Sequence, residues 1–151
     1  MQFQVKHFSE LTPAELHKIY ALRAEVFVVE QDCPYLDPDE KDPAALHMSG
    51  YESNSLVAYC RIIPPGVSYQ EASIGRVVVP AKERNKGMGR KLMSEAIHVT
   101  LNMFKAGEIV ISAQCYLEPF YKSLGFVSES APYEEDGIPH VRMRYQATAA
   151  R

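Results

Sequence analysis

Two glycines stand one residue apart in the stretch ERNKGMGRKL, residues 83–92, among the basic side chains of Arg84, Lys86, Arg90 and Lys91. The stretch follows three valines and a proline and precedes a segment with the periodicity of an amphipathic helix. Glycines let a ligand approach the backbone closely, and the free N–H groups and dipole of a helix N-terminus attract anions. We therefore interpret these residues as a loop that receives a phosphate group.

A solvated surface turn is the alternative, because an Arg-x-x-Gly-x-Gly pattern is weak by itself. Its position between a valine-rich strand and a helix strengthens the phosphate interpretation. Two other phosphate motifs do not fit this loop. A P-loop needs Gly-Lys followed by Ser or Thr, and a dinucleotide fingerprint needs a third glycine where Leu92 stands. A pyrophosphate held by backbone N–H groups fits best.

The composition is that of a globular protein. The 151 residues favour one domain, and a net charge of -3 argues against a general nucleic-acid or membrane-surface binder. The N-terminal residues do not resemble a signal peptide, and three cysteines without metal-type spacing predict neither a disulfide framework nor a metal site. We expect a reduced cytoplasmic protein with no nucleic-acid, membrane or metal partner.

The hydrophobic patterns predict the order β-α-β-β-β-α-β-α-β-β. Strands are expected at residues 2–8, 45–51, 55–64, 72–79, 108–114, 126–130 and 140–146. Helices are expected from Pro13 to near Glu30, from the glycine loop to just before Gly107, and at 116–124. This order favours an α/β (α+β) chain with a mixed central sheet of about six to seven strands and helices on both faces.

The segment IGRVVVPAKERNKGMGRKLM resembles motif A of the GNAT acyltransferases, whose Arg/Gln-x-x-Gly-x-Gly/Ala loop grips the pyrophosphate of coenzyme A. The element order is similar to that fold over the whole chain. The stretches LRAEVFVVEQDCPY, IGRVVV and YEEDGIPH are similar to the ElaA subgroup. The resemblance implies a single N-acetyltransferase domain, residues 1–151, that uses acetyl-CoA as co-substrate. It also implies direct acetyl transfer to a primary amine in a ternary complex.

The resemblance also assigns the cofactor-binding residues. The pyrophosphate would lie on the loop residues Arg84, Lys86, Gly87, Met88, Gly89 and Arg90. The pantetheine arm would pair with the backbone of the strand Val77, Val78 and Val79. A backbone N–H near Val78 would polarise the thioester carbonyl, as in an oxyanion hole. The valines also suit a buried strand, and both roles are compatible because the ligand uses the backbone.

Gln114, at the end of the expected strand 108–114, and Tyr121, in the helix that follows it, complete the implied site. Tyr121 matches the tyrosine that many GNAT enzymes use as a general acid toward the departing sulfur, whereas a tyrosine beside Phe120 without that context is more often a core residue. Gln114 stands where many GNAT proteins carry asparagine. The amide is retained, so a contact to pantetheine is expected, with a different reach.

The general base and the acceptor side are less well defined. Glu30 is a candidate base, although a solvated helix-end charge and a water chain are alternatives. His140 is considered because histidine is the residue type suited to proton transfer at neutral pH, but it equally suits a structural role. Gln31, Asp37 and the acidic segment to residue 42 are expected to line the acceptor cleft or to form a solvated loop. Arg23, on an apolar helix face, needs an anionic partner, and we favour bracing of this loop over contact with a substrate.

Two rival functions follow from the same residues. The Arg-x-x-x-Phe of LRAEVF also resembles acyl-homoserine-lactone synthases, which take acyl groups from acyl carrier protein and favour tryptophans that this chain lacks. A non-catalytic CoA-binding sensor or interaction module is the second rival. The acceptor itself, whether a small molecule or a peptide amine, is not specified by the sequence, and a homodimer is compatible with it.

Overall fold

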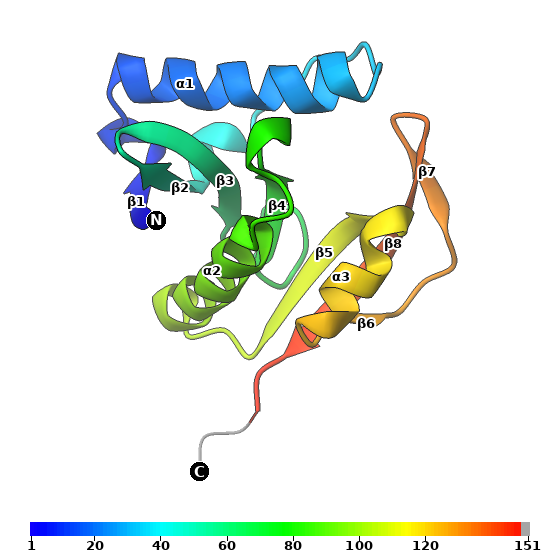
Figure 1. Ribbon diagram of the computed structural model, residues 1–151. Helices are drawn as coiled ribbons and strands as arrows, with labels where there is room; N and C mark the ends of the chain where they lie inside the picture. The colour runs from blue at the N-terminus through cyan, green and yellow to red at the C-terminus, as the bar shows by residue number, and fades with distance from the viewer. Residues whose placement is uncertain (149–151) are drawn as a thin grey trace.

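The computed structural model describes residues 1–148 and contains strands and helices in nearly the predicted order (Figure 1). The strands are β1 (Gln2–His7), β2 (Leu46–Glu52), β3 (Ser55–Ile63), β4 (Ser73–Val78), β5 (Glu108–Gln114), β6 (Val127–Ser128), β7 (Tyr133–Glu135) and β8 (Ile138–Gln146). The α-helices are α1 (Pro13–Arg23), α2 (Met88–Phe104) and α3 (Glu118–Ser123). Short 3-10 turns occupy Phe8–Glu10, Asp42–Ala44, Ala81–Glu83 and Cys115–Leu117.

The strands form two antiparallel sheets rather than one continuous sheet. The first has the order β1-β2-β3-β4, and in the second β8 pairs with β5, β6 and β7. One parallel bridge between Ala72 and Ile109 joins them, with the Val110 N–H donating to the Ala72 carbonyl at 3.0 Å. Beyond this bridge β4 and β5 diverge, so two strand edges face a gap instead of each other (Figure 1).

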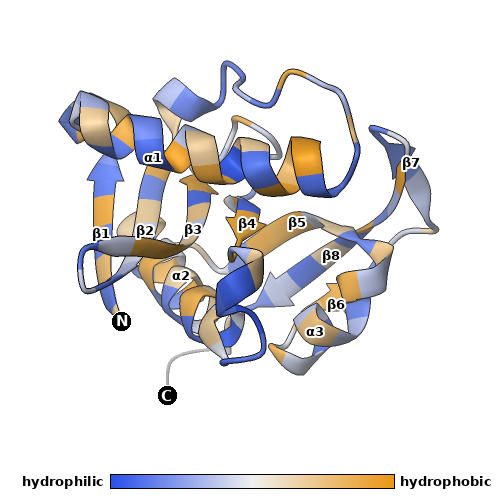
Figure 2. Ribbon diagram, turned by 45° about the horizontal axis from the view of Figure 1, so that its top comes forward, coloured by the Kyte–Doolittle hydropathy of each residue, from blue (hydrophilic) through white to orange (hydrophobic). Residues whose placement is uncertain are grey.

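Helices cover both faces of the first sheet, as the sequence predicts. Alternation along β3 sends Cys60 to the core cluster that contains Leu92 of α2, and Tyr59 to the cluster that contains Ile19 of α1. Strand β5 is mostly hydrophobic along its length (Figure 2) and is buried in the first of these clusters. No helix within residues 1–148 is long and apolar enough to cross a membrane.

Strand β4 contains a β-bulge that the sequence did not predict. Arg61 of β3 pairs with Gly75 and Tyr59 pairs with Val78, so the one residue between them on β3 opposes two residues of β4. Arg76 in the extra step has φ 50°, a left-handed conformation that is uncommon for a non-glycine residue. The bulge reverses the alternation, so Val78 packs with Tyr59 on the α1 side of the sheet.

The first helix changes type where the sequence predicted a single α-helix to Glu30. Residues Ala24–Glu30 form a π-helical segment in continuation of α1. The Gln31 N–H donates to the Val26 carbonyl at 3.2 Å and the Cys33 N–H to the Val28 carbonyl at 3.0 Å, both five residues back. Such wider turns are rare and occur frequently at functional sites.

The C-terminal part contains a turn at EEDGIP, residues 134–139, as the sequence predicts, and a short strand, β7, that it did not predict. Strand β7 joins β8 through Asp136 (φ 53°) and Gly137 (φ 76°), the two left-handed residues that a two-residue turn requires. The expected strand at 126–130 shortens to β6, and β8 begins at Ile138 rather than at residue 140. The hairpin extends the second sheet beside the gap between β4 and β5.

Candidate active site

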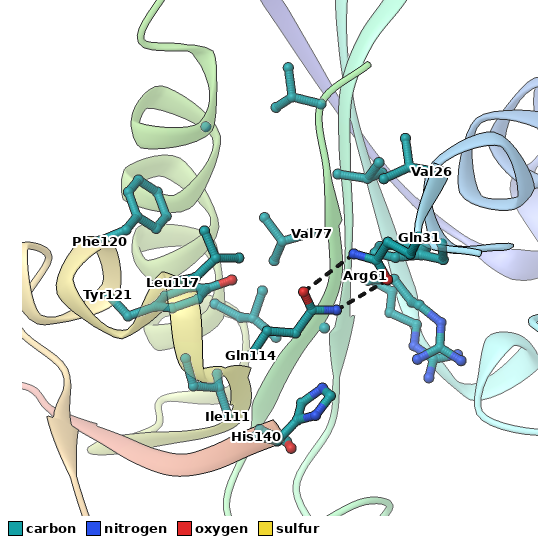
Figure 3. A pocket seen from close by; sticks show the side chains of 18 of the residues that line it. Val26, Gln31, Arg61, Val77, Ile111, Gln114, Leu117, Phe120, Tyr121 and His140 are labelled. Atoms are coloured by element: carbon teal, nitrogen blue, oxygen red, sulfur yellow. Dashed lines mark hydrogen bonds between the residues drawn. The ribbon is translucent and has the colours of Figure 1, made fainter. Parts of the chain in front are cut away.

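A cleft of about 730 Å³ opens where β4 and β5 diverge. Its walls come from the π-helical segment, β4, the glycine loop, α3, β5 and β8 (Figure 3). All of the site residues expected from the sequence line this cleft except Arg23, Asp37 and Lys86. The fold therefore brings together residues from five separate parts of the chain.

The glycine loop presents the N-terminus of α2 to the cleft. Gly87 is the N-cap residue with φ 77°, and the first intrahelical bond of the helix is from the Lys91 N–H to the Gly87 carbonyl at 3.1 Å. The N–H groups before Lys91 thus have no helical acceptor. A Cβ at Gly89 would meet Phe120 at 3.7 Å and Val79 at 4.0 Å, which are ordinary contacts. Packing alone would admit a small side chain there.

The basic residues of the loop have different partners. Arg84 donates to both carboxylate oxygens of Glu30, at 2.6 and 3.0 Å, and its Nε donates to the Val79 carbonyl at 3.0 Å. Arg90 donates to the Ser123 hydroxyl at 2.6 Å and lies in the cleft wall. Lys86 instead pairs with Glu83 at 3.0 Å and does not line the cleft. The cofactor role predicted for Lys86 therefore lacks support from its position.

Strand β4 has one hydrogen-bonded edge and one edge toward the cleft. It pairs with β3 on one side, and on the other side the bridge to β5 lies at Ala72, just before the strand begins. Val77, Val78 and Val79 line the cleft beyond the bulge at Arg76. The unpaired edge can therefore accept an extended ligand as an additional strand.

Tyr121 lies in the cleft wall on α3 and is 6 % exposed (Figure 3). Burial raises the pKa of its phenol above the ordinary value, and the neighbouring Cys60 and Tyr116 add to the effect. Its ring packs edge-on against Phe120 and Phe126, at centroid distances of 5.2 and 5.9 Å. The phenol is therefore protonated and held in a fixed position.

Two amides meet across the cleft. Gln31, at the end of the π-helical segment, and Gln114, at the end of β5, exchange two hydrogen bonds of 3.3 Å (Figure 3). Both were expected in the site from the sequence, but their mutual contact was not. Together with the Glu30–Arg84 pair, this contact ties the end of the first helix to the opposite wall.

Arg23 braces the acidic loop, which is the interpretation that the sequence favoured. It is fully buried, with Nε donating to Asp37 at 2.8 Å and Nη1 to Asp42 at 2.8 Å. Asp37 also accepts from Arg76 at 2.8 Å, and Arg61 donates to Asp42 at 2.8 Å. Arg23 and Asp37 are thus engaged with each other and with this network, and neither lines the cleft.

The charges around Asp42 and the burial of His47 shift the pKa values of these two side chains. Burial by itself would raise the pKa of Asp42, but hydrogen bonds from Arg23 and Arg61 outweigh it and lower the pKa to about 2. Nε2 of His47 donates to the Asp42 carbonyl at 2.9 Å, Nδ1 lies 2.7 Å from the Tyr59 hydroxyl, and burial lowers the pKa of the ring. At neutral pH the network therefore holds ionised carboxylates and a neutral histidine.

Several residues of this network were not predicted from the sequence. Arg61 stands alone in the apolar run VAYCRII and Arg76 in IGRVVV, so each carried the same signal as Arg23. A cation inside a buried strand requires a carboxylate partner. Asp39 and Asp42, which supply it, were treated only as part of an acidic loop.

His140 lies on β8 directly opposite Gln114 and lines the cleft (Figure 3). Its side chain is largely buried, and Nδ1 lies 2.7 Å from the carbonyl of Ile138. Because a carbonyl can only accept, the proton of the neutral ring resides on Nδ1. His140 thus lies in the cleft, and its role on the substrate side stays a prediction.

The splayed sheet, the helix N-terminus and the tyrosine in one cleft are the arrangement of the GNAT fold. The sequence model of a protein family, described as an acetyltransferase (GNAT) domain, matches residues 23–147. The chain therefore belongs to the GNAT acetyltransferase family.

Three proteins are similar to this chain over nearly its whole length. A UPF0039 protein of Schizosaccharomyces pombe is 45 % identical over 148 residues, which cover 97 % of each chain. The crystal structure of Escherichia coli ElaA is 37 % identical with a TM-score of 0.89 and coverage of 96 % of this chain and 99 % of that one. An acyl-CoA N-acyltransferase from Pseudomonas aeruginosa is 36 % identical, with a TM-score of 0.90 and coverage of 95 % and 98 %. The similarity to ElaA agrees with the subgroup indicated by the sequence.

Proposed function

We propose that the protein transfers an acetyl group from acetyl-CoA directly to a primary amine of a small molecule or peptide. The observation that carries this proposal is that the free edge of β4, the N-terminus of α2 and Tyr121 share one cleft. Such a cleft can hold a long thioester along a strand edge while leaving its reactive end beside an acid. The family to which the chain belongs supports the acyltransferase class.

In this proposal the donor lies along β4 with its pyrophosphate on the glycine loop. The N–H groups that precede Lys91 and the side chain of Arg90 bind the phosphates, and the N–H groups of Val77–Val79 pair with the pantetheine arm. The bulge at Arg76 reorients the strand, so that an N–H near Val78 polarises the thioester carbonyl. Gln114 offers its amide to the same arm.

Tyr121 acts on the departing sulfur. Because burial raises the pKa of the phenol, Tyr121 enters the reaction protonated and donates a hydrogen bond to the thiolate as the C–S bond breaks. The amine nitrogen that has attacked the carbonyl still carries an extra proton, and this proton replaces the one that the thiolate takes. The phenol is thereby regenerated without a change in its charge.

The donor site is tested by thermal melting with and without acetyl-CoA, with NAD and ATP as controls. At a ligand concentration a hundred times the Kd, binding adds about 2.7 kcal/mol to stability and raises Tm by several degrees. No shift at millimolar acetyl-CoA would refute the proposal. A shift justifies a screen of amines by release of free CoA, and turnover separates an enzyme from a CoA-binding module.

Two variants of the glycine loop sharpen this test. Arg90→Gln and Lys86→Gln remove the same charge from the same loop, but Arg90 lines the cleft whereas Lys86 pairs with Glu83 outside it. We expect Arg90→Gln to weaken acetyl-CoA binding about tenfold, the order of one charge-assisted phosphate contact, and Lys86→Gln to change it less than about twofold. Equal effects would mean that only net charge matters.

A further inference from the structure

One corner of the cleft brings together polar groups that the donor does not use. Glu135 of β7, at the start of the hairpin turn, and His140 of β8 both line the cleft. Nε2 of His140 lies 3.4 Å from a carboxylate oxygen of Glu135. The hydroxyl of Ser112 on β5 donates to the other carboxylate oxygen at 3.3 Å and lies 2.6 Å from the hydroxyl of Tyr133. The carboxylate therefore contacts side chains of both β5 and β8.

The hydrogen bond at Nδ1 determines what Nε2 can do. Because Nδ1–H donates to the Ile138 carbonyl, Nε2 of the neutral ring carries a lone pair. This lone pair and the Glu135 carboxylate are two acceptors only 3.4 Å apart. Two adjacent acceptors are favourable when a cationic donor joins them, and an alkylammonium group has three N–H donors with which to do so.

Contacts at the β7–β8 hairpin keep Glu135 and His140 next to each other at the cleft. The thiol of Cys33, in the segment that follows the first helix, lies 3.1 Å from the carbonyl of Asp136 at the turn. Tyr133 stacks on the ring of His140 with an interplanar angle of 23°. The imidazole plane is therefore set by contacts on its face as well as by its bond to Ile138.

The other candidate base is engaged elsewhere. Both carboxylate oxygens of Glu30 accept hydrogen bonds from Arg84 of the glycine loop. Proton acceptance at Glu30 would break this ion pair and leave Arg84 with only its contact to Val79. His140 requires no such loss, because a proton at Nε2 creates an imidazolium beside the Glu135 carboxylate.

We propose that the ammonium group of the acceptor docks between Glu135 and His140, and that Nε2 of His140 takes its proton. This inference rests on the proposed acetyl transfer. The ammonium N–H bond breaks and an Nε2–H bond forms, and the neutral amine then attacks the thioester carbonyl. The proton on His140 passes to solvent. After the attack the amine nitrogen loses a second proton, which replaces the one that Tyr121 delivers to the thiolate. One acetylated amine, one CoA thiol and one proton result.

The proposal is tested by NMR of the ¹⁵N-labelled full chain, with n-butylammonium chloride as the probe. His140 is assigned by the loss of its signals in His140→Gln. We expect the neutral ring to carry its proton on Nδ1 and its Nε2 resonance to move with n-butylammonium but not with equimolar NaCl or n-butanol. A ring protonated on Nε2, or an equal response to NaCl, would overturn the proposal.

Two neighbouring carboxylates of the hairpin provide a matched pair of variants. Glu135 lines the cleft and Glu134, the preceding residue on β7, does not. Glu135→Gln should reduce the n-butylammonium response at least fivefold, whereas Glu134→Gln should leave it unchanged. Equal responses in the two variants would refute the docking of the ammonium group at Glu135.

The proton-transfer step is tested by the rate of CoA release with n-butylamine as acceptor. His140→Gln should lower kcat about 100-fold, within the range for loss of a general base, and leave the Kd of acetyl-CoA within about twofold. An unchanged kcat would refute the role of His140. The melting shift with acetyl-CoA is independent of these results. If that shift is absent, the proposed function fails, whereas if it is present and Nε2 does not respond, only this inference fails.

Discussion

Replacement of Asp42 by Asn tests how much the buried charge network beside the cleft contributes to the free energy of unfolding. Asp42 is fully buried and accepts hydrogen bonds from Arg23 at 2.8 Å and Arg61 at 2.8 Å. In the variant, the buried guanidinium groups of Arg23 and Arg61 lose one carboxylate partner. The new amide N–H₂ group also faces their N–H donors, with which it cannot form a hydrogen bond. The Nε of Arg61 already lacks a partner within residues 1–148, so the network has no spare acceptor.

The expected loss of stability follows from two independent magnitudes. A fall of the Asp42 pKa from 3.8 to about 2 corresponds to about 2.5 kcal/mol of stability at neutral pH. Removal of one partner from a buried ion pair typically costs about 3–5 kcal/mol. We therefore expect Asp42→Asn to lower the free energy of unfolding by about 3 kcal/mol and Tm by roughly 6–12 °C.

Urea unfolding followed by circular dichroism measures this loss, and its pH dependence tests the cause. The contribution of a carboxylate with a lowered pKa is complete above about pH 4 to 5 and disappears as the pH falls toward 2. The difference between wild type and Asp42→Asn should therefore shrink between pH 5 and pH 2.5. Asp39→Asn serves as a control. The Asp39 side chain also pairs with Arg61 but is 29 % exposed, so this variant should lower the free energy of unfolding by only about 1 kcal/mol. A loss below 1 kcal/mol for Asp42→Asn at pH 7, or one equal to that of Asp39→Asn, would refute the reasoning.

Three further variants test other parts of the site. Tyr121→Phe should lower turnover at least about tenfold and leave the acetyl-CoA Kd unchanged in calorimetry, and undiminished turnover would exclude Tyr121 as the acid. Glu30→Gln should tighten acetyl-CoA binding about threefold, because Arg84 no longer divides its hydrogen bonds between a carboxylate and the phosphates, and weaker binding would contradict this competition. Gly87→Ala should cost about 1 kcal/mol in thermal melts, since φ is 77° but no atom lies within 4 Å of the added Cβ.

Features that depend on local chemistry could be predicted from the sequence. Thr12 is the N-cap of α1, with the Glu15 N–H donating to its hydroxyl at 3.1 Å, and the Thr-Pro-x-Glu spacing is a typical signature of such a cap. The glycine loop is also at a helix N-terminus, with Gly87 in the left-handed region. Both signals are contained in a few consecutive residues, so they do not depend on the rest of the fold.

Features that depend on pairing between distant segments could not be predicted. The bulge at Arg76 exists only relative to the register of β3, and nothing in IGRVVV distinguishes it from a regular strand. The π-helical turns change the spacing of hydrogen bonds without changing the residue types that suit a helix. Strand β7 is three residues long and lacks apolar alternation, although the Asp136–Gly137 turn beside it was recognisable.

The acidic loop shows why charge alone misdirected the interpretation of the acceptor side. Three arginines stand singly among apolar residues, and each must find a carboxylate when its segment is buried. The loop supplies Asp37, Asp39 and Asp42 to them, so its negative charge is consumed inside the protein. A positively charged acceptor therefore gains little from these residues. On the cleft wall at this end the hairpin contributes Glu135 and Asp136, and Glu135 is the one beside His140, so selection for an amine is expected there.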